Sequence, residues 1–452
     1  MTSADVRAGH EFAAVIVGSG PGGATVAREL ARKGKDVLIL EWGDFDPVRG
    51  KVFETVRRAL IPGKGLLLTD GFLGMIRAIT TGGSSVIYCA TAFDPPSAMF
   101  LPNGVDLGRE IAELRREIPI APLEDRLVGP GPRRFFESAS ALGYDARRLN
   151  KFIYQERCRP SCQLCSYGCP YGAKWNARFF VDDAIKAGAT IINHSRVTRV
   201  LSDGGRAVGV VYRKEGLEKR AYAKKVIISA GGIGTPLILK ESGIPEAGRD
   251  FFFDPLVFVF GRIRGLDEGR AVPMTTGVHL EEDGIVMTDF NMPKILKIGF
   301  DAEVLGIRQA FSYKDVLPVM IKIRDDLGGR LTRRGSIRKP LTRADKMRLQ
   351  KGSEHASRIL RKAGAKEIYK SWVFAAHPGG TAKMGELVDS NLKTRFEDLY
   401  VCDCSVMPQE MGIPPTFTIL ALAKRLSAHL LGKEGSGGIA QEAGRAGIRE
   451  MP

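Results

Sequence analysis

The chain has 452 residues and a formal net charge of +16, with 44% hydrophobic and 26% charged residues. The hydrophobic and charged fractions are ordinary for a soluble globular protein, the length suits roughly two or three domains, and the net charge is high. No apolar run approaches the ~18–20 residues of a membrane-spanning helix, and the polar residues 1–11 do not resemble a signal peptide. The seven cysteines are mostly clustered, which favours a reducing, cytoplasmic location over a secreted disulfide scaffold.

The first predicted unit begins with residues 12–17, an apolar run typical of a buried parallel strand. The glycine-rich sequence G-S-G-P-G-G follows, then a predicted helix over 24–33 and a second strand over 36–40 that ends at Glu41. This is the G-x-G-x-x-G dinucleotide fingerprint in its full context of strand, helix, strand and acidic residue.

Each residue type in the fingerprint is explained by what the structure requires at that position. Gly18 permits the tight turn, and Gly20 lets the backbone approach a pyrophosphate. Gly23, with Gly22 beside it, lets the helix and the strand pack closely. The phosphates would lie at the helix N-terminus, and Glu41 can accept hydrogen bonds from a ribose diol. We expect a dinucleotide here, and the position near the N-terminus is more typical of FAD than of NAD.

An apolar segment punctuated by glycines, residues 61–79, leads to the loop Gly82-Gly83-Ser84-Ser85. One interpretation is a turn before a core strand. The other is a loop whose bare backbone passes along a flat cofactor. The composition of residues 106–142 predicts helices joined by turns.

Four of the cysteines, Cys158, Cys162, Cys165 and Cys169, lie within twelve residues at C-x3-C-x2-C-x3-C-P spacing. Four thiolates so close together suit a soft metal, and the spacing is close to the ferredoxin-type run C-x2-C-x2-C-x3-C-P. We expect an iron–sulfur cluster, either 4Fe–4S or 3Fe–4S. Structural zinc, disulfides and free thiols are the alternatives.

Alternating helices and strands follow the cysteines. A helix over 177–187, strands over 190–193, 197–200, 208–213 and 224–230, and a helix over 233–242 are predicted. Residues 250–370 show a different pattern, with amphipathic strands, which predicts an inserted sheet-and-helix domain. Its expected elements are strands over 256–263, 284–291 and 306–313 and a helix over 343–363.

The positive charge is concentrated in residues 322–351, which hold eleven Lys or Arg against three Asp. We interpret this stretch as a solvated basic helix and loop. The alternatives are a surface for an anionic membrane or for an acidic redox partner. Nucleic acid is not expected as a partner, because no helix-turn-helix, zinc-finger or aromatic RNA-binding signature accompanies the charge.

Three sequence motifs follow one another near the end of the chain. They are A-His377-P-G-G-T, then Asp403-Cys404-S-V-M-P, then G-I-Pro414-Pro415-Thr416. These resemble the C-terminal signature of the glucose–methanol–choline (GMC) oxidoreductases. The loop at 82–85 resembles the flavin loop of that family, and residues 229–236 resemble its S-A-G-x-x-x-S-P segment.

The resemblance implies an α/β fold of GMC or p-hydroxybenzoate-hydroxylase-like architecture, with a Rossmann-type FAD-binding domain built from discontinuous segments. It implies an FAD-binding domain over 1–250, a substrate domain over 251–372 and a return to the FAD-binding domain over 373–432. The composition of residues 433–452, rich in Gly, Glu and Arg, predicts a flexible tail. The implied cofactor-binding positions are Gly18, Gly20, Gly22, Gly23, Glu41, Gly82, Gly83, Ser84, Ser85, Val197, Ala230, Gly231, Asp403, Cys404, Pro415 and Thr416.

The resemblance also implies oxidation of an alcohol, with His377 as the base that takes the hydroxyl proton while a hydride passes to flavin N5. The helix near Thr416 would point its positive end at the flavin. Two positions depart from the family. The second catalytic position, His or Asn in relatives, is Pro414, and Glu410 is our hypothesis for its replacement. The Asn that ends the flavin loop is Tyr88.

Some GMC dehydrogenases hold an iron–sulfur cluster through cysteines followed by C-P-x-G-A-K-like sequence, as in residues 169–174 here. The resemblance therefore implies that electrons leave the flavin through the cluster to an external acceptor or redox partner protein. The alternatives are an oxidase that uses O2 and has structural cysteines, or a catalytically altered binding protein. Residues 61–79 and 322–351 together suggest peripheral contact with a membrane and a lipid-like alcohol.

Overall fold

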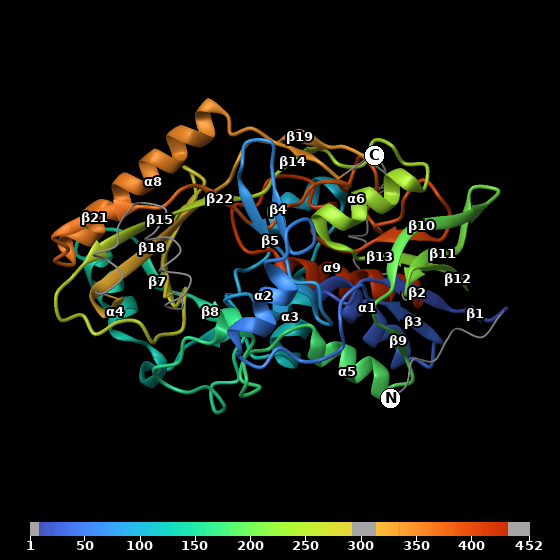
Figure 1. Cartoon of the computed structure of the whole chain (residues 1–452), viewed down its shortest axis with the longest axis horizontal. Coiled ribbons are helices and arrows are strands. Elements are labelled where there is room, and N and C mark those ends of the chain that lie inside the picture. The colour runs from blue at the N-terminus through green and yellow to red at the C-terminus, as the bar shows by residue number, and fades with distance from the viewer. Residues whose placement is uncertain (1–8, 292–312, 334, 433–452) are drawn as a thin grey trace, which may run out of the picture.

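The computed structural model describes residues 9–291, 313–333 and 335–432, which form two lobes side by side along the longest axis (Figure 1). One lobe carries the Rossmann-type sheet and the other a larger, mostly antiparallel sheet. Most of the predicted strand over 306–313 and the whole predicted tail over 433–452 lie outside the described residues. No helix in the described ranges is long and apolar enough to cross a membrane.

The Rossmann sheet has five strands in the order β23-β13-β2-β3-β9, and every pair is parallel. These strands are short, apolar and largely buried on both faces, as parallel strands covered by helices should be. They come from the beginning, middle and end of the chain, so the predicted assembly from discontinuous segments is confirmed. Their bounds are β2 Ala14–Val17, β3 Val37–Leu40, β9 Thr190–Ile192, β13 Val226–Ile228 and β23 Leu399–Val401.

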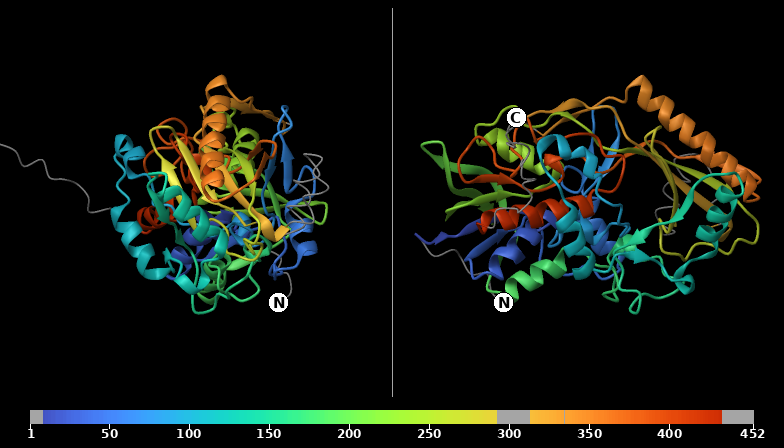
Figure 2. Two further views of the ribbon diagram at one scale, coloured as in Figure 1. Left: turned by 90° about the vertical axis from the view of Figure 1, so that its left-hand side faces the viewer. Right: turned by 180° about the vertical axis from the view of Figure 1, so that it is seen from behind.

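Helices cover this sheet. Helix α1 packs between α5 and α9, and α3 packs on the outer side of α9. The rear view shows α9 lying along α1 (Figure 2). Their bounds are α1 Pro21–Ala31, α3 Gly108–Glu117, α5 Arg178–Lys186, α6 Gly231–Glu241 and α9 Thr416–Leu430. A four-stranded sheet flanks the lobe, with the strands β1 Glu11–Phe12, β10 Arg196–Asp203, β11 Arg206–Lys214 and β12 Leu217–Ala223.

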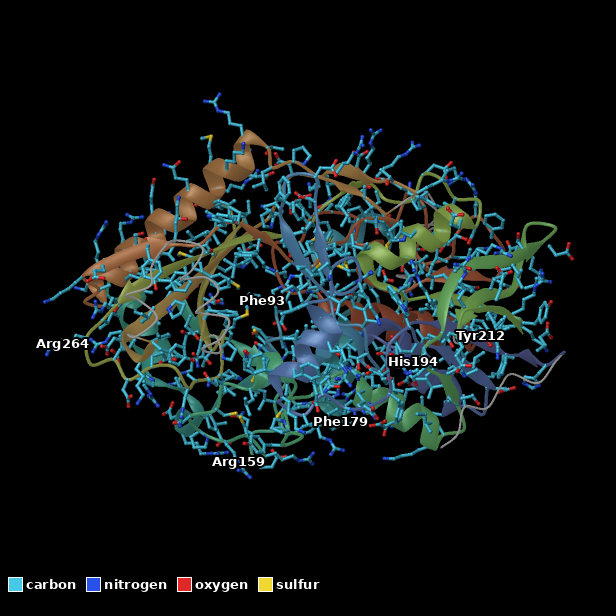
Figure 3. All side chains as sticks on the ribbon, in the orientation of Figure 1. Phe93, Arg159, Phe179, His194, Tyr212 and Arg264 are labelled. Carbon is cyan, nitrogen blue, oxygen red and sulfur yellow. The ribbon has the colours of Figure 1, made fainter. Side chains whose placement is uncertain are left out.

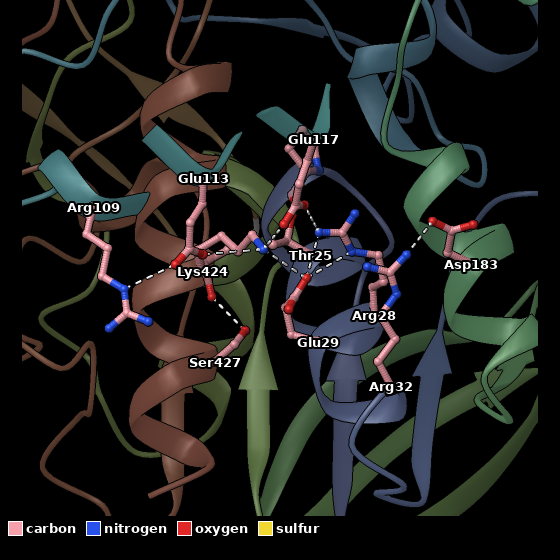
Figure 4. Close-up of polar contacts among 12 residues, drawn as sticks. Thr25, Arg28, Glu29, Arg32, Arg109, Glu113, Glu117, Asp183, Lys424 and Ser427 are labelled. Carbon is pink, nitrogen blue, oxygen red and sulfur yellow. Dashed lines mark hydrogen bonds and ion pairs between the residues drawn. The ribbon is translucent and has the colours of Figure 1, made fainter. Parts of the chain in front are cut away.

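An ion-pair cluster joins α1, α3 and α9 (Figure 4). Lys424 of α9 lies 3.3 Å from Glu29, 3.7 Å from Glu113 and 2.5 Å from Glu117. Arg28 of α1 contacts both Glu29 and Glu117. Arg28 and Lys424 are almost wholly buried, so the three carboxylates are needed to compensate two desolvated cations.

The second lobe is built on a nine-stranded sheet. Besides strands from the 250–370 region, the sheet includes a hairpin from residues 66–76, strand β7, and β22, which ends two residues before His377. Its strands are β4 Leu66–Leu68, β5 Gly74–Ile76, β7 Ala146–Arg148, β15 Pro255–Arg262, β16 Thr276–Leu280, β17 Ile285–Asp289, β18 Val316–Ile323, β21 Glu367–Lys370 and β22 Phe374–Ala375. Small sheets add β6 Ala121–Pro122, β8 Asn150–Lys151, β14 Arg249–Phe251, β19 Gly328–Leu331 and β20 Ile337–Arg338.

The two faces of the nine-stranded sheet differ. Alternate residues such as Val319 and Ile321 pack against α8 Arg343–Lys362, which begins with a capping box, and α4 Pro130–Ser140 packs on α8. The opposite face carries Phe258, Phe260 and Met320 in a separate apolar cluster. Because side chains alternate along a strand, Lys322 lies on the same face of β18 as Met320. Among the described residues, one further helix, α2 Val52–Ala59, lies beside η5 Cys165–Tyr167.

Replacing Lys424 by Met should destabilise the Rossmann lobe by on the order of 2 kcal/mol, because the substitution leaves Glu117 with one partner fewer in a mostly buried cluster. Urea unfolding followed by circular dichroism measures this. Lys393→Met is the matched control, since Lys393 makes a solvent-exposed pair with Glu397 and its loss should matter little. Equal effects of the two substitutions would contradict the proposed contribution of the buried cluster to the free energy of unfolding.

Candidate active site

The glycine-rich turn between β2 and α1 is shaped for a ligand. A side chain at Gly18, Gly22 or Gly23 would collide with backbone: the added Cβ would lie 2.4 Å from Ser229 O, 1.9 Å from Cys402 O or 2.1 Å from Gly18 O, respectively. At Gly20 a Cβ would meet nothing within 4 Å. Gly20 is the N-cap of α1, and no side chain caps that helix. The free space and the uncapped first turn fit a pyrophosphate at the helix N-terminus.

Glu41 lies at the carboxyl end of β3, buried beside this turn. Its carboxylate accepts hydrogen bonds from the Ser19 hydroxyl (2.6 Å), the Ser19 amide (3.0 Å) and the Gly43 amide (2.7 Å). Burial raises the pKa of Glu41, although these hydrogen bonds oppose the shift. The carboxylate is therefore held in a fixed position, as a residue that accepts hydrogen bonds from a ribose must be.

The predicted flavin loop lies directly against the glycine-rich turn. The Gly82 amide donates to the Ser19 hydroxyl (3.1 Å), and a Cβ on Gly83 would lie 3.1 Å from the Gly20 Cα. Within the loop, the Ser85 hydroxyl donates to Gly82 O (2.6 Å), and the Ser84 hydroxyl accepts from the Ala78 amide (3.1 Å). The loop therefore begins beside the residues expected to bind the phosphates.

The segment at 229–236 meets the end of β23. The carboxylate of Asp403 accepts hydrogen bonds from the Gly231 amide (2.8 Å), the Thr235 hydroxyl (2.5 Å) and the Ser405 amide (2.8 Å). Ala230 is the N-cap of α6. Burial raises the pKa of Asp403, and its hydrogen bonds oppose that shift. The predicted positions Ala230, Gly231 and Asp403 are thus brought together across two strands.

The other predicted cofactor positions are more scattered. Val197 is buried in β10, at an irregularity between β10 and β11. Cys404 is buried beside the loop that carries His377, with its Sγ 3.9 Å from His377 O. Pro415 and Thr416 stand at the start of α9, whose N-terminus has no side-chain cap. Such a helix end can interact favourably with an anionic group.

His377 leaves β22 with a positive φ of 47°. Its Nδ1 atom lies 3.2 Å from Asp254 Oδ2 and 3.1 Å from Lys322 Nζ. Its Nε2 atom makes no hydrogen bond with any part of the chain that the structure describes, and about a third of the side chain (33%) is exposed. Burial, together with the Lys322 charge, lowers the pKa of His377, so the imidazole is neutral at neutral pH. A neutral imidazole with one ring nitrogen unengaged can accept a proton.

Two of these neighbours, Asp254 and Lys322, were missed by the sequence reasoning. Lys322 Nζ lies 3.1 Å from Asp254 Oδ2, and both side chains are essentially inaccessible to solvent. Asp254 Oδ1 also accepts from the Gly412 amide (3.0 Å). No motif marks either residue. Only the placement of a lysine inside the apolar run V-M-I-K-I could have drawn attention to it.

In the described residues, neither Pro414 nor Glu410 makes a hydrogen bond or an ion pair with His377. Pro414 is buried and follows Gly412, which has a φ of 64°. Glu410 is partly buried, and its charge acts on Arg348 at the start of α8, whose pKa it helps to raise. Tyr88, which stands where relatives have Asn, donates from its hydroxyl to Trp175 O (2.7 Å).

The cysteine run is tied to the flavin loop by Lys174. The buried ammonium donates to Val86 O (2.7 Å), Tyr88 O (2.9 Å) and Cys165 O (2.5 Å). Arg159, the residue after Cys158, lies at the lower edge of the molecule in Figure 3. The run therefore passes from the surface to the interior beside the predicted cofactor.

The four cysteines do not form a metal site in this arrangement. Within the described residues, no group of three or more His, Cys, Asp or Glu side chains is placed to hold a metal ion. Burial raises the pKa of Cys165 to about 12 and, with the help of Cys162 and Cys169, that of Cys158 to about 11. These thiols are protonated at neutral pH, and a metal would have to displace their protons.

Comparisons with known proteins decide the family. Residues 106–256 and 332–423 match the GMC oxidoreductase models, which together cover more than half of the chain, and residues 16–45 match an NAD(P)-binding Rossmann-like domain. The chain belongs to the GMC oxidoreductase family. It is an FAD-dependent oxidoreductase that acts on CH–OH groups.

Individual relatives are distant. An uncharacterised GMC-type oxidoreductase of Mycobacterium tuberculosis is 28% identical over 95% of this chain and 77% of its own length. The long-chain-alcohol oxidase FAO1 of Arabidopsis thaliana is 25% identical over 92% of this chain and 66% of its own length. The crystal structure of pyridoxine 4-oxidase from Mesorbium loti superposes with a TM-score of 0.71 at 16% identity, covering 93% of this chain and 99% of the other. The last comparison confirms the predicted fold.

Proposed function

We propose that His377 is the base of this GMC oxidoreductase and takes the proton from the hydroxyl of the alcohol substrate at its Nε2 atom. FAD, when bound, accepts the hydride. The observation that carries the proposal is the fixed, neutral imidazole: Asp254 lies within hydrogen-bonding distance of Nδ1, and no described residue engages Nε2. Proton transfer by a positioned histidine typically contributes 10²–10⁴-fold to the rate.

FAD fits the residues that are present. The open space at Gly20, the buried carboxylate of Glu41 and the adjoining loop at 82–85 match the needs of a pyrophosphate, a ribose and a flat ring. Asp403, Pro415 and Thr416 would lie toward the ring end of the cofactor. The remaining predicted cofactor positions follow from the family resemblance.

The face of the nine-stranded sheet next to His377 is apolar, which supports an alcohol with an apolar part as the substrate. Phe258, Phe260 and Met320 lie on the face opposite α8, where they are buried in one apolar cluster, and Lys322, next to His377, continues that face. The similarity to the long-chain-alcohol oxidase FAO1 supports the same substrate class.

Replacing His377 by Gln should slow the reduction of bound FAD by alcohol at least about 10²-fold, because glutamine cannot accept the proton. Anaerobic stopped-flow absorbance of the flavin, with medium- and long-chain alcohols as substrates, measures this. His355→Gln is the control, since His355 contacts Tyr144 on the far face of the sheet. Unchanged reduction in the His377 variant, with FAD retained, would refute the role of His377.

We also propose that the cysteine run binds an iron–sulfur cluster and that an external acceptor or redox partner protein receives the electrons. The spacing of the cysteines and the bridge that Lys174 makes to the flavin loop support this. The four sulfur atoms would have to move together on metal binding. The structure holds them in no such arrangement, so we derive no catalytic step from the cluster.

Anaerobic purification should give a brown protein with about four iron atoms per chain, the content of a 4Fe–4S cluster. Replacing Cys165 or Cys169 by Ser should remove the iron and leave the FAD in place. Iron and zinc analysis with electron paramagnetic resonance measures this, and Cys402→Ser, a buried cysteine elsewhere, is the control. Stoichiometric zinc, or rapid peroxide formation by an iron-free protein, would instead favour an oxidase with structural cysteines.

A peripheral membrane contact is a further part of the proposal. The β4–β5 hairpin exposes Phe72 (85%) and Leu68 (54%). The hairpin is joined to β20 by a bond from the Asp70 amide to Ile337 O (2.9 Å), and β20 pairs with β19, which carries Arg330. Apolar side chains next to arginines suit an anionic lipid surface.

The protein should sediment with phosphatidylglycerol vesicles at low salt and less with phosphatidylcholine vesicles, because both apolar and electrostatic terms contribute. Phe72→Ser should weaken binding, whereas Leu217→Ser, an exposed leucine on the flanking sheet, should not. Failure of the wild-type protein to bind anionic vesicles at low salt would refute the membrane contact.

A further inference from the structure

A buried cation lies next to the proposed catalytic base. Lys322 projects from β18, where it is paired between Leu256 of β15 and Val286 of β17 at the centre of the nine-stranded sheet. Its Nζ atom lies 3.1 Å from His377 Nδ1 and 3.1 Å from Asp254 Oδ2. The three side chains therefore touch one another, and the carboxylate lies within reach of both nitrogen atoms.

The backbone around this cluster is held in an unfavourable conformation. Both Asp254 and His377 have a φ of 47°, in the left-handed region that costs a non-glycine residue roughly 1 kcal/mol or more. Their segments are tied together next to the cluster, because Phe252 and Gly379 exchange two backbone hydrogen bonds of 3.1 and 3.0 Å. Gly412 adds a bond from its amide to Asp254 Oδ1. The fold therefore constrains the positions of both side chains.

The charges of Asp254 and Lys322 explain why the His377 imidazole needs both partners. A carboxylate alone beside an imidazole favours the imidazolium, which cannot accept a proton. A lysine alone would donate to Nδ1 and leave the ring proton on Nε2, the wrong tautomer for a base facing the substrate. With both present, Asp254 can accept a hydrogen bond from the protonated Nδ1, and Lys322 offsets the charge of Asp254.

Other charged groups near the cluster are already paired or lie on its backbone side. Asp325 accepts from the Asp254 amide (3.0 Å) and pairs with Lys339 (3.0 Å). Cys404 approaches the carbonyl oxygen of His377, and burial keeps the pKa of its thiol well above the usual value. Thus Asp254 and Lys322 are the two charged side chains in the described residues that contact the imidazole.

We propose that Asp254 and Lys322 form a positioning pair for His377, in which Asp254 fixes the tautomer with the proton on Nδ1 and Lys322 keeps the imidazole neutral. The inference rests on the proposed function of His377 as the base. It assigns no contact between the pair and the substrate.

Titration of His377 tests the pair directly. The chain has only six histidines, so FAD-loaded protein labelled with 13C and 15N in histidine should give few signals, and His377→Gln assigns the one from His377. In the wild-type protein the pKa of His377 should lie below the ordinary value of about 6.5, with Nδ1 carrying the proton. Lys322→Met should raise this pKa by about one unit or more, because the uncompensated carboxylate favours the imidazolium. The pH at which flavin reduction is half-maximal should rise with it.

Lys339→Met is the matched control, since it breaks an equally buried lysine–aspartate pair that does not touch His377. It should leave the titration of His377 unchanged. An unchanged pKa in Lys322→Met, or an equal shift in Lys339→Met, would overturn the proposal.

If Lys322→Met does not fold, the neutral pair Lys322→Met with Asp254→Leu provides the test, because no buried charge is then left unpaired and residue 254 can no longer accept a hydrogen bond from Nδ1. The 15N shifts of His377 should show loss of the fixed Nδ1-protonated tautomer, and retention of that tautomer would overturn the proposal. These signals do not depend on turnover. Failure of the pair is therefore distinguishable from failure of His377 as the base, which the Gln variant reports through flavin reduction.

Discussion

The short segment 377–381 is hydrogen-bonded to both lobes at once, and the arrangement of the site depends on this. On one side, Gly379 pairs with Phe252, at the entry to the nine-stranded sheet. On the other, the Gly380 amide donates to Cys404 O (3.0 Å) and the Thr381 hydroxyl to Gly232 O (2.9 Å), both in the Rossmann lobe. A Cβ at Gly232 would lie 1.8 Å from Pro378 O, so the helix and the loop meet without space for a side chain. The proposed base is thereby fixed relative to the predicted cofactor site.

The parts of the site that sequence reasoning found are those in which local chemistry dictates structure. The glycine spacing predicted the turn before α1 because a Cβ at Gly18, Gly22 or Gly23 would strike backbone. His377 was predicted through the motif around it. The order of β2, α1 and β3 also followed, because apolar runs and glycines mark short-range elements well.

Asp254 and Lys322 could not be found in this way. Their contact depends on the register in which β15 and β18 pair, and this register joins residues almost seventy positions apart. The charge count in 322–351 was also misleading. The interpretation of this stretch as a solvated helix and loop is wrong for Lys322 and Lys339, which are buried in ion pairs with aspartates. A tally of charges does not distinguish a buried pair from a solvated surface. The hairpin of β4 and β5 was also not predicted, because its pairing with β22 joins residues that are far apart in the sequence.

Strand β23 has a consequence for the synthesis of the protein. It completes one edge of the Rossmann sheet by pairing with β13, yet its residues follow the whole of the other lobe in the chain. Contacts between segments so far apart in sequence form late, because closing the intervening loop is entropically costly. During translation, the edge of that sheet at β13 therefore stays unpaired until β23 has been synthesised. FAD capture is thus expected after residue 416 has emerged, and a chaperone that shields the open edge should increase the yield of cofactor-loaded protein.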